Sequence, residues 1–200
     1  MNRLNRDVMS GWSVFDERLN IDFHSVLWVH PDGNVVIDPL PLSEHDRIHL
    51  EQLGSVSTIV ITNSDHTRAS KLLAEATGAR ILGPAAERAQ FEFECDDWLD
   101  DGDVVVPGLS VLTLHVSKTP GELALLLEET TLITGDLIRA HEAGKLCLLP
   151  DPKLSDKEKA VASLRRCTDL PGIETVLPGD GWPVFRGGGR ALAELAAAFD

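Results

Sequence analysis

The sequence predicts an α/β fold of the αββα type, a four-layer sandwich in which two β-sheets pack face to face and helices cover their outer surfaces. Apolar stretches of strand length cluster in both halves of the chain, with helical stretches between them. Residues 57–84 read as strand, helix and strand, which is typical of a right-handed crossover. The chain has 200 residues, 43% of them hydrophobic, which suits one well-buried core. We therefore expect residues 1–200 to form a single domain.

Turn residues and helix caps set the expected elements of the first half. VLWVH and NVVID are strands separated by PDGN, which has the residues of a hairpin turn. Ser43 followed by Asp46 resembles a capping box, so a helix is expected from there to Gly54. STIVI is then a short buried strand, ASKLLAEATG a helix, and ARILGP a strand.

The second half repeats this alternation less regularly. DVVV, GLSVLTLHV, ELALLLEE and TTLIT are expected to be successive strands, followed by a loop from Gly135 to Pro152. Ser155 with Glu158 predicts a capped helix that ends near Cys167. ETVLP is one more buried strand, and RALAELAAAF is a final helix.

The composition argues against several classes of function. The formal charge is −14, so the basic surface that nucleic acid requires is not expected. No apolar run approaches the ~20 residues that span a bilayer, and the first residues lack the apolar core of a signal peptide. Cys95, Cys147 and Cys167 are widely spaced and form no CxxC, which favours reduced thiols. We expect a cytoplasmic protein without a membrane partner.

Polar residues follow four apolar stretches at the point where each predicted strand ends. These stretches, STIVITNSDH, VLTLHVSKTPGE, TLITGD and ETVLPGDG, carry Asp65, His66, Lys118, Asp136 and Asp180. In α/β folds the carboxyl ends of strands are where ligands bind. If the four turns meet, their crowded carboxylates must hold a cation, have raised pKa values, or be satisfied by backbone N–H groups and Lys118. Asp38 ends a further strand and is expected nearby.

The order of these turns resembles the metallo-β-lactamase superfamily, whose strand-end motifs run HxHxDH, GHT, GD and GHG on an αββα sandwich. The resemblance extends from VVIDP to the final PGDG. HxHxDH corresponds to residues 61–66, which keep Asp65 and His66 but lack both leading histidines; an alignment through Thr62 with two residues deleted does not restore them. Lys118 stands at the GHT histidine, Asp180 stands at the GHG histidine, and GD is unchanged.

The resemblance implies that one of the family's two metal sites is lost, because its three histidines are absent. The other would rest on Asp65, His66, Asp136 and Asp180, which are expected to converge on one side of the sandwich. Three carboxylates and an imidazole suit manganese, iron or magnesium as well as zinc, so we expect one divalent metal ion per chain (zinc, manganese or iron) or none. On this interpretation the chain is a mononuclear metal-dependent hydrolase of unspecified substrate, and its candidate catalytic residues are Asp65 and Lys118.

A second interpretation requires no metal. The Lys118 ammonium would lie near Asp136 or Asp180 and replace the charge of the lost cation, with Asn63 completing the hydrogen bonds. The chain would then be a non-catalytic binding or regulatory module. A third interpretation leaves Lys118 exposed and without a role.

Three residues are candidates for contact with a substrate. Asn63 lies in the turn before Asp65, and Arg139 and His141 lie in the loop after Gly135, where Arg139 suits an anionic group. A small-molecule ligand is therefore expected, and the sequence predicts neither its identity nor the oligomeric state. Asp65 and His66 also have a plain explanation, in which Asp65 caps a helix and His66 is a surface residue of its first turn.

Overall fold

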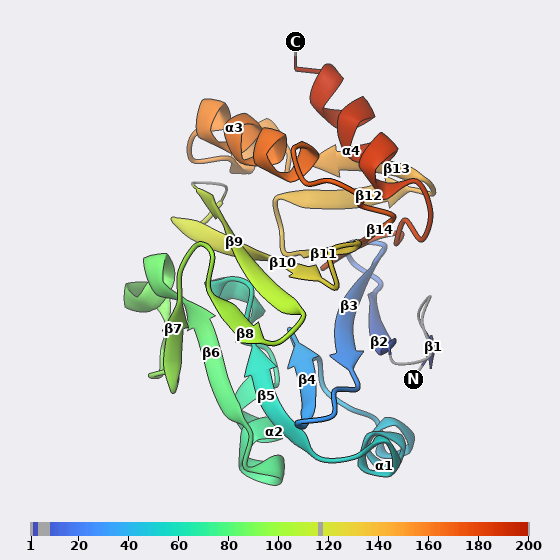
Figure 1. The fold of residues 1–200 in the computed structure, drawn as a ribbon, viewed down its shortest axis with the longest axis vertical. Helices are drawn as coiled ribbons and strands as arrows, with labels where there is room; N and C mark the ends of the chain where they lie inside the picture. Colours follow the sequence, from blue (N-terminus) through green and yellow to red (C-terminus); the bar gives the residue numbers. More distant parts are fainter. Residues whose placement is uncertain (1, 4–8, 116–117, 200) are drawn as a thin grey trace.

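A computed structural model describes residues 2–3, 9–115 and 118–199 of the chain. These residues form the four layers of the predicted αββα sandwich, and the fold class is confirmed (Figure 1). Two helices, α1 (Glu44–Leu53) and α2 (Ser70–Thr77), pack against the outer face of the first sheet. Two others, α3 (Lys157–Thr168) and α4 (Gly188–Ala197), pack against the second.

The first sheet follows the order of the chain within the described residues. Its strands are β1 (Asn2–Arg3), β2 (Met9–Asp16), β3 (Ile21–Trp28), β4 (Asn34–Ile37), β5 (Val56–Val60), β6 (Arg80–Pro84) and β7 (Asp97–Leu99). Neighbours from β1 to β4 are antiparallel, and those from β4 to β7 are parallel. The change of direction at β4 follows from its connections, because a short turn joins β3 to β4 while α1 crosses over from β4 to β5.

The second sheet has the order β14-β11-β10-β9-β8. Its strands are β8 (Val104–Val106), β9 (Leu109–His115), β10 (Gly121–Leu127), β11 (Thr131–Thr134) and β14 (Thr175–Pro178). Strands β11 and β14 are parallel, and the other pairs are antiparallel. The sequence of β10 is almost continuously apolar because the strand lies inside a sheet that is covered on both faces.

Three apolar clusters separate the layers. The cluster between the sheets includes Val35 and Leu125, both with no exposed surface. Leu50 of α1 and Leu73 of α2 join the cluster outside the first sheet, and Leu164 of α3 joins the cluster outside the second. Each sheet is therefore buried on both faces.

Two predictions for the second half of the chain are wrong. The segment expected to be a loop from Gly135 to Pro152 contains a hairpin of β12 (Ile138–Glu142) and β13 (Lys145–Leu148), followed by a short 3-10 helix, η3 (Asp151–Lys153). The α3 helix is capped by Asp156, whose side chain accepts a hydrogen bond from the Lys159 backbone N–H, and Ser155 instead donates its hydroxyl to the Lys118 carbonyl. The expected cap at Ser43 is confirmed, since its hydroxyl oxygen accepts from the Asp46 N–H.

The carboxyl ends of β4, β5, β11 and β14 carry the polar turns. Asp38 follows β4 and bonds to Thr62 beyond β5. A 3-10 helix, η1 (Ser64–His66), follows Thr62, and Gly135 and Gly179 follow β11 and β14. A Cβ atom added at Gly179 would lie 2.9 Å from His66 Cε1, so the turns of the two sheets meet. None of the helices in the described part of the chain is long and apolar enough to cross a membrane.

Replacing Leu125 by alanine tests the core between the sheets. Leu125 is completely buried, so Leu125→Ala is expected to lower the free energy of unfolding by about 2–5 kcal/mol. Val104→Ala is the matched control, because Val104 is 62% exposed and its loss should cost less than about 0.5 kcal/mol. Urea unfolding of both variants measures the difference, and equal effects would contradict this assignment of the core.

Candidate functional site

The site begins with a buried hydrogen-bonded group around Asp38. The Thr62 backbone N–H donates to Asp38 Oδ1 at 2.7 Å, and the Thr62 hydroxyl donates to Oδ2 at 2.6 Å. His66 Nδ1 lies 2.7 Å from the same Oδ2, and both side chains are almost fully buried. Asp38 therefore fixes the His66 ring and turns its Nε2 toward Asp136 Oδ1, 3.4 Å away.

The carboxylates beside His66 favour its protonated form. Burial by itself lowers the pKa of His66, but the Asp38 carboxylate, aided by Asp136, raises it to about 9. Burial also opposes the ionisation of Asp136, yet His66 and Lys118 hold the pKa of that carboxyl well below its usual range. In the protonated form both ring nitrogens carry a hydrogen, and His66 then has no lone pair to offer to a metal ion.

Lys118 places its ammonium between two carboxylates. Its Nζ forms an ion pair with Asp65 Oδ2 and lies 3.6 Å from Asp136 Oδ2. The Lys118 side chain is 43% exposed and Asp65 46%, whereas Asp136 is 13% exposed. Partial burial by itself lowers the pKa of Lys118, but these two carboxylates raise it above its usual value. The ammonium thus bridges an exposed acid and a largely buried one.

Asp180 is held by a planar fork from Arg139. Arg139 Nε donates to Asp180 Oδ1 at 2.7 Å, and Nη2 donates to Oδ2. The Arg139 side chain is 10% exposed and that of Asp180 3%, so this ion pair is shielded from water. His141 lies at the rim, with Nε2 3.9 Å from Asp180 Oδ1. Arg139 thereby occupies both carboxylate oxygens of Asp180.

Arg68 is a further cation of the site, which the sequence analysis missed. Its Nη1 donates to the carbonyl oxygens of His24 at 2.7 Å and Asp38 at 3.0 Å. Its Nη2 is buried and has no hydrogen-bond partner among the described residues. Burial lowers the pKa of Arg68, while nearby Asp38, Asp136 and Asp180 oppose the shift. Arg68 lies two residues after His66, where the sequence looks like the start of an ordinary helix, so no sequence motif marked it.

Asn63 and Gly135 show how closely the turns approach. The Asn63 amide oxygen accepts from the Asp65 N–H at 3.0 Å, so Asn63, and not Asp65, caps η1. Its amide nitrogen is buried and has no partner among the described residues. A Cβ atom at Gly135 would lie 2.8 Å from that nitrogen and 2.9 Å from Thr62 Oγ1, so only glycine fits. The alternative reading of His66 as a surface residue is wrong, because His66 is 4% exposed.

The site has equal numbers of acidic and basic groups. We call this group the strand-end centre, and its described members are Asp38, Asp65, Asp136 and Asp180 with His66, Arg68, Lys118 and Arg139. Each carboxylate has a cation beside it. The self-repulsion expected of crowded carboxylates is therefore relieved by side chains of the same chain.

The residues present do not fit a metal ion in this arrangement. Within the part of the chain that the structure describes, no group of three or more His, Cys, Asp or Glu side chains is placed to hold a metal ion. The structure links Asp65 and Asp136 through Lys118 and places His66 beside Asp136, whereas Asp180 is separately held by Arg139. A metal would need a deprotonated His66 and the displacement of a lysine.

Fold and site together define a four-layer αββα protein with a polar centre at the ends of its strands. The family model of the metallo-beta-lactamase superfamily matches residues 1–199. The chain therefore belongs to the metallo-beta-lactamase superfamily. A search of curated proteins finds no match.

Solved structures support the same fold. The metallo-beta-lactamase DIM-1 is 12% identical, with a TM-score of 0.76, and the match covers 100% of this chain and 97% of that one. A metallo-beta-lactamase from Erythrobacter litoralis is 13% identical, with a TM-score of 0.77 and coverage of 98% and 95%. FIM-1 from Pseudomonas aeruginosa, in its mono-zinc form, is 14% identical, with a TM-score of 0.70 and coverage of 96% and 91%. At these identities the likeness concerns the fold alone.

The raised pKa of His66 predicts a loss of stability at alkaline pH. The folded value of about 9 exceeds the unfolded value of about 6.5, so the contribution is complete below 6.5 and is lost as pH rises through 9. The expected loss is about 3 kcal/mol of unfolding free energy. Urea unfolding between pH 6 and 10 with chelator present measures it. His66→Gln should remove this slope, and a wild type whose stability stays flat over the range would refute the charged imidazole.

Loss of Arg139 tests the shielded ion pair. Arg139→Ala leaves the buried Asp180 carboxylate without its paired guanidinium and should cost about 3–5 kcal/mol of stability. Arg139→Lys keeps the charge but not the fork, so a smaller loss is expected. Arg190→Ala is the matched control, because Arg190 is 82% exposed and its pair with Glu194 should contribute less than about 1 kcal/mol. If thermal unfolding shows equal losses of stability for Arg139→Ala and Arg190→Ala, the role given to the Arg139–Asp180 ion pair is contradicted.

Proposed function

We propose that this chain is a metal-independent, non-catalytic member of the superfamily that acts as a binding or regulatory module. The observation that carries the proposal is the position of the Lys118 ammonium, between Asp65 and Asp136. A cation bound there would be coordinated by the same two carboxylates. An ammonium supplies the charge but no vacant coordination position, so it cannot bind and polarise a water molecule as a catalytic metal does.

The other potential metal ligands support this proposal. The Asp38 carboxylate holds His66 and raises its pKa, which favours the protonated form, whereas a histidine must be neutral to bind metal. Asp180 is occupied by Arg139 through both oxygens. Before a metal could use the predicted set of ligands, His66 would have to lose its proton, and Lys118 and Arg139 would have to move away from their carboxylates.

A mononuclear metal-dependent hydrolase of unspecified substrate is the second candidate. One observation favours it: Asp136 lies 3.4 Å from His66 and is linked to Asp65 by Lys118, whose side chain is 43% exposed. If Lys118 swings into solvent, those three donors become available to one zinc, manganese or iron ion. Asp65 and Asp136 would then bind through oxygen and His66 through Nε2. Asn63, Arg139 and His141 remain the candidates for substrate contact in this case.

Thermal unfolding of wild type and Lys118→Ala, each with chelator and with zinc or manganese, separates the two candidates. In chelator, Lys118→Ala should lower the free energy of unfolding by about 1–2 kcal/mol. This value lies between those of exposed and buried ion pairs, because Lys118 is partly exposed whereas Asp136 is largely buried. Added metal should restore the stability of the variant and leave the stability of wild type unchanged, since an ion that binds only the folded state stabilises that state by mass action. Lys145→Ala, at a 67% exposed lysine, is the control and should resemble wild type.

Two results would contradict the proposal. Strong stabilisation of wild type by metal would identify a working mononuclear centre. Equal stability of wild type and Lys118→Ala in chelator would show that Lys118 does not balance the site.

A further inference from the structure

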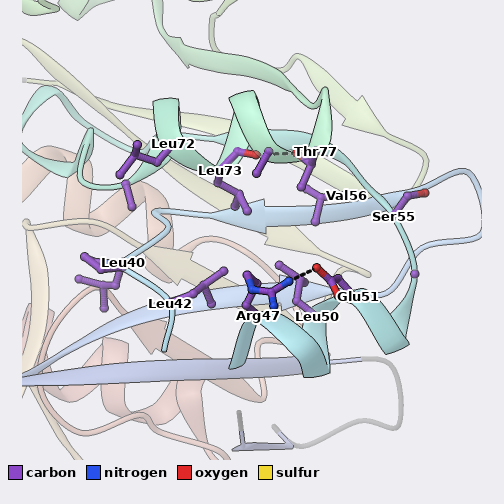
Figure 2. A pocket seen from close by; sticks show the side chains of 14 residues that line it. Leu40, Leu42, Arg47, Leu50, Glu51, Ser55, Val56, Leu72, Leu73 and Thr77 are labelled. Atoms are coloured by element: carbon purple, nitrogen blue, oxygen red, sulfur yellow. Dashed lines mark hydrogen bonds and ion pairs between the residues drawn. The ribbon is translucent and has the colours of Figure 1, made fainter. Parts of the chain in front are cut away.

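A second potential binding site lies on the outer face of the first sheet. An apolar cavity of about 750 Å³ opens between α1 and α2, within the range of roughly 300–1,000 Å³ found for small-molecule pockets. Figure 2 shows side chains of the two helices facing each other across this cavity. Its lining comes from both helices, the segment before α1 and strand β5: Leu42, Leu50, Val56, Leu72, Leu73 and Ala76.

The packing of α1 is incomplete at this cavity. A helix on a protein surface normally buries a full apolar stripe, but Leu50 is the one buried residue among the ten of α1. Across the cavity, Leu72 of α2 lines the wall and is 70% exposed. An apolar molecule between the helices would remove this surface from water, which is favourable. The exposed apolar side chain at this cavity is therefore Leu72 of α2, which a ligand could cover.

The surroundings of the cavity favour a small molecule over a protein. Small-molecule pockets have mostly apolar walls with a few polar groups among them, whereas a polar rim by itself is also found around protein interfaces. Here the lip is charged, because Arg47 and Glu51 line the cavity and Glu44 lies beside them on α1. A hollow with apolar walls and a charged lip suits an occupant that enters it.

The charges of the lip select the polar end of that occupant. Arg47 is paired with Glu51 through Nη1 and with Glu44 through Nε, the latter at 3.0 Å, so two carboxylates face one guanidinium. A ligand carboxylate would have to displace Glu51 from Arg47 and would meet a chain of formal charge −14. Together Glu44, Glu51 and Arg47 carry one net negative charge, which attracts a ligand ammonium even though it would share Glu51 with Arg47. Charge complementarity therefore points to a cationic head group.

We propose that the cavity between α1 and α2 binds a cationic amphiphile, a small molecule with an apolar body between Leu50 and Leu73 and a positively charged end at Glu51. The proposal does not depend on the charge or metal state of the strand-end centre. Two residues that line the cavity are nevertheless close in sequence to residues of that centre. Leu40 and Ala69 line it, and they stand next to the segments that carry Asp38 and Arg68.

Displacement of a neutral fluorescent dye from the whole chain tests the proposal. Nile red should bind at about one molecule per chain, and Ala76→Trp, which fills the cavity, should weaken its binding at least about tenfold. Glu75→Trp is the matched control, because Glu75 neighbours Ala76 on α2 and does not line the cavity. This control should bind the dye as wild type does. Dye that binds equally to wild type and Ala76→Trp would overturn the assignment.

Competition with two amphiphiles of equal chain length tests the charge. Below their micelle-forming concentrations, decyltrimethylammonium should displace the dye at about one tenth of the concentration that decanoate requires. Glu51→Gln should reduce this preference, since Glu51 is 63% exposed and its replacement removes one carboxylate of the lip. Preference for decanoate, or a preference that Glu51→Gln leaves unchanged, would refute the cationic ligand. A dimer of the chain that Ala76→Trp dissociates, seen by size-exclusion chromatography, would show instead that the cavity is an interface between two copies.

Discussion

Neutralisation of four aspartates at the ends of buried strands is the constraint on which the rest of the structure depends. Asp38, Asp136 and Asp180 are at most 13% exposed, and an isolated carboxylate in such a place would be strongly unfavourable. A bound metal ion is one way to balance such charges. In this chain the balance is made by side chains, and each of them has a fixed partner at hydrogen-bonding or ion-pairing distance.

This internal balance explains several local features. Gly135 and Gly179 are glycines because a Cβ atom at either would collide with Asn63 or His66. Thr62 uses both its backbone N–H and its hydroxyl to hold Asp38. The buried Glu87 accepts the Ser64 N–H at 2.6 Å and so anchors the turn that carries Asp65 and His66. Hydrogen bonds therefore hold these turns in place, and the turns in turn place the side chains that balance one another's charges.

Much of the fold could be predicted from the sequence, because strand ends and caps are local signals. The strand before Asp38, the cap at Ser43 and the alternation of sheets with helices followed from patterns of a few residues. The β12–β13 hairpin was missed because Gly and Pro dominate its surroundings and its pairing shifts register at a bulge. The cap of α3 was predicted one residue too early, because Ser155 and Asp156 are both of residue types that cap helices.

The candidate site was only partly predictable, for a different reason. Residues that follow strands are visible in the sequence, and Lys118 at a ligand position already suggested a substitute for a cation. Arg68 and the pairing of Arg139 with Asp180 were not visible, since they depend on contacts between segments far apart in the chain. The cavity between α1 and α2 was also invisible, because it reflects how two helices sit on a sheet and no motif encodes that.

The metal content of wild type and Lys118→His tests the central claim most directly. Each protein would be dialysed against zinc, freed of unbound ion and analysed for metal by mass spectrometry. If the Lys118 ammonium takes the place of a cation, wild type should hold almost none, and the histidine variant, which offers a neutral donor at that position, should hold about one ion per chain. Wild type that retains about one zinc per chain would show that a metal, and not Lys118, balances the strand-end centre.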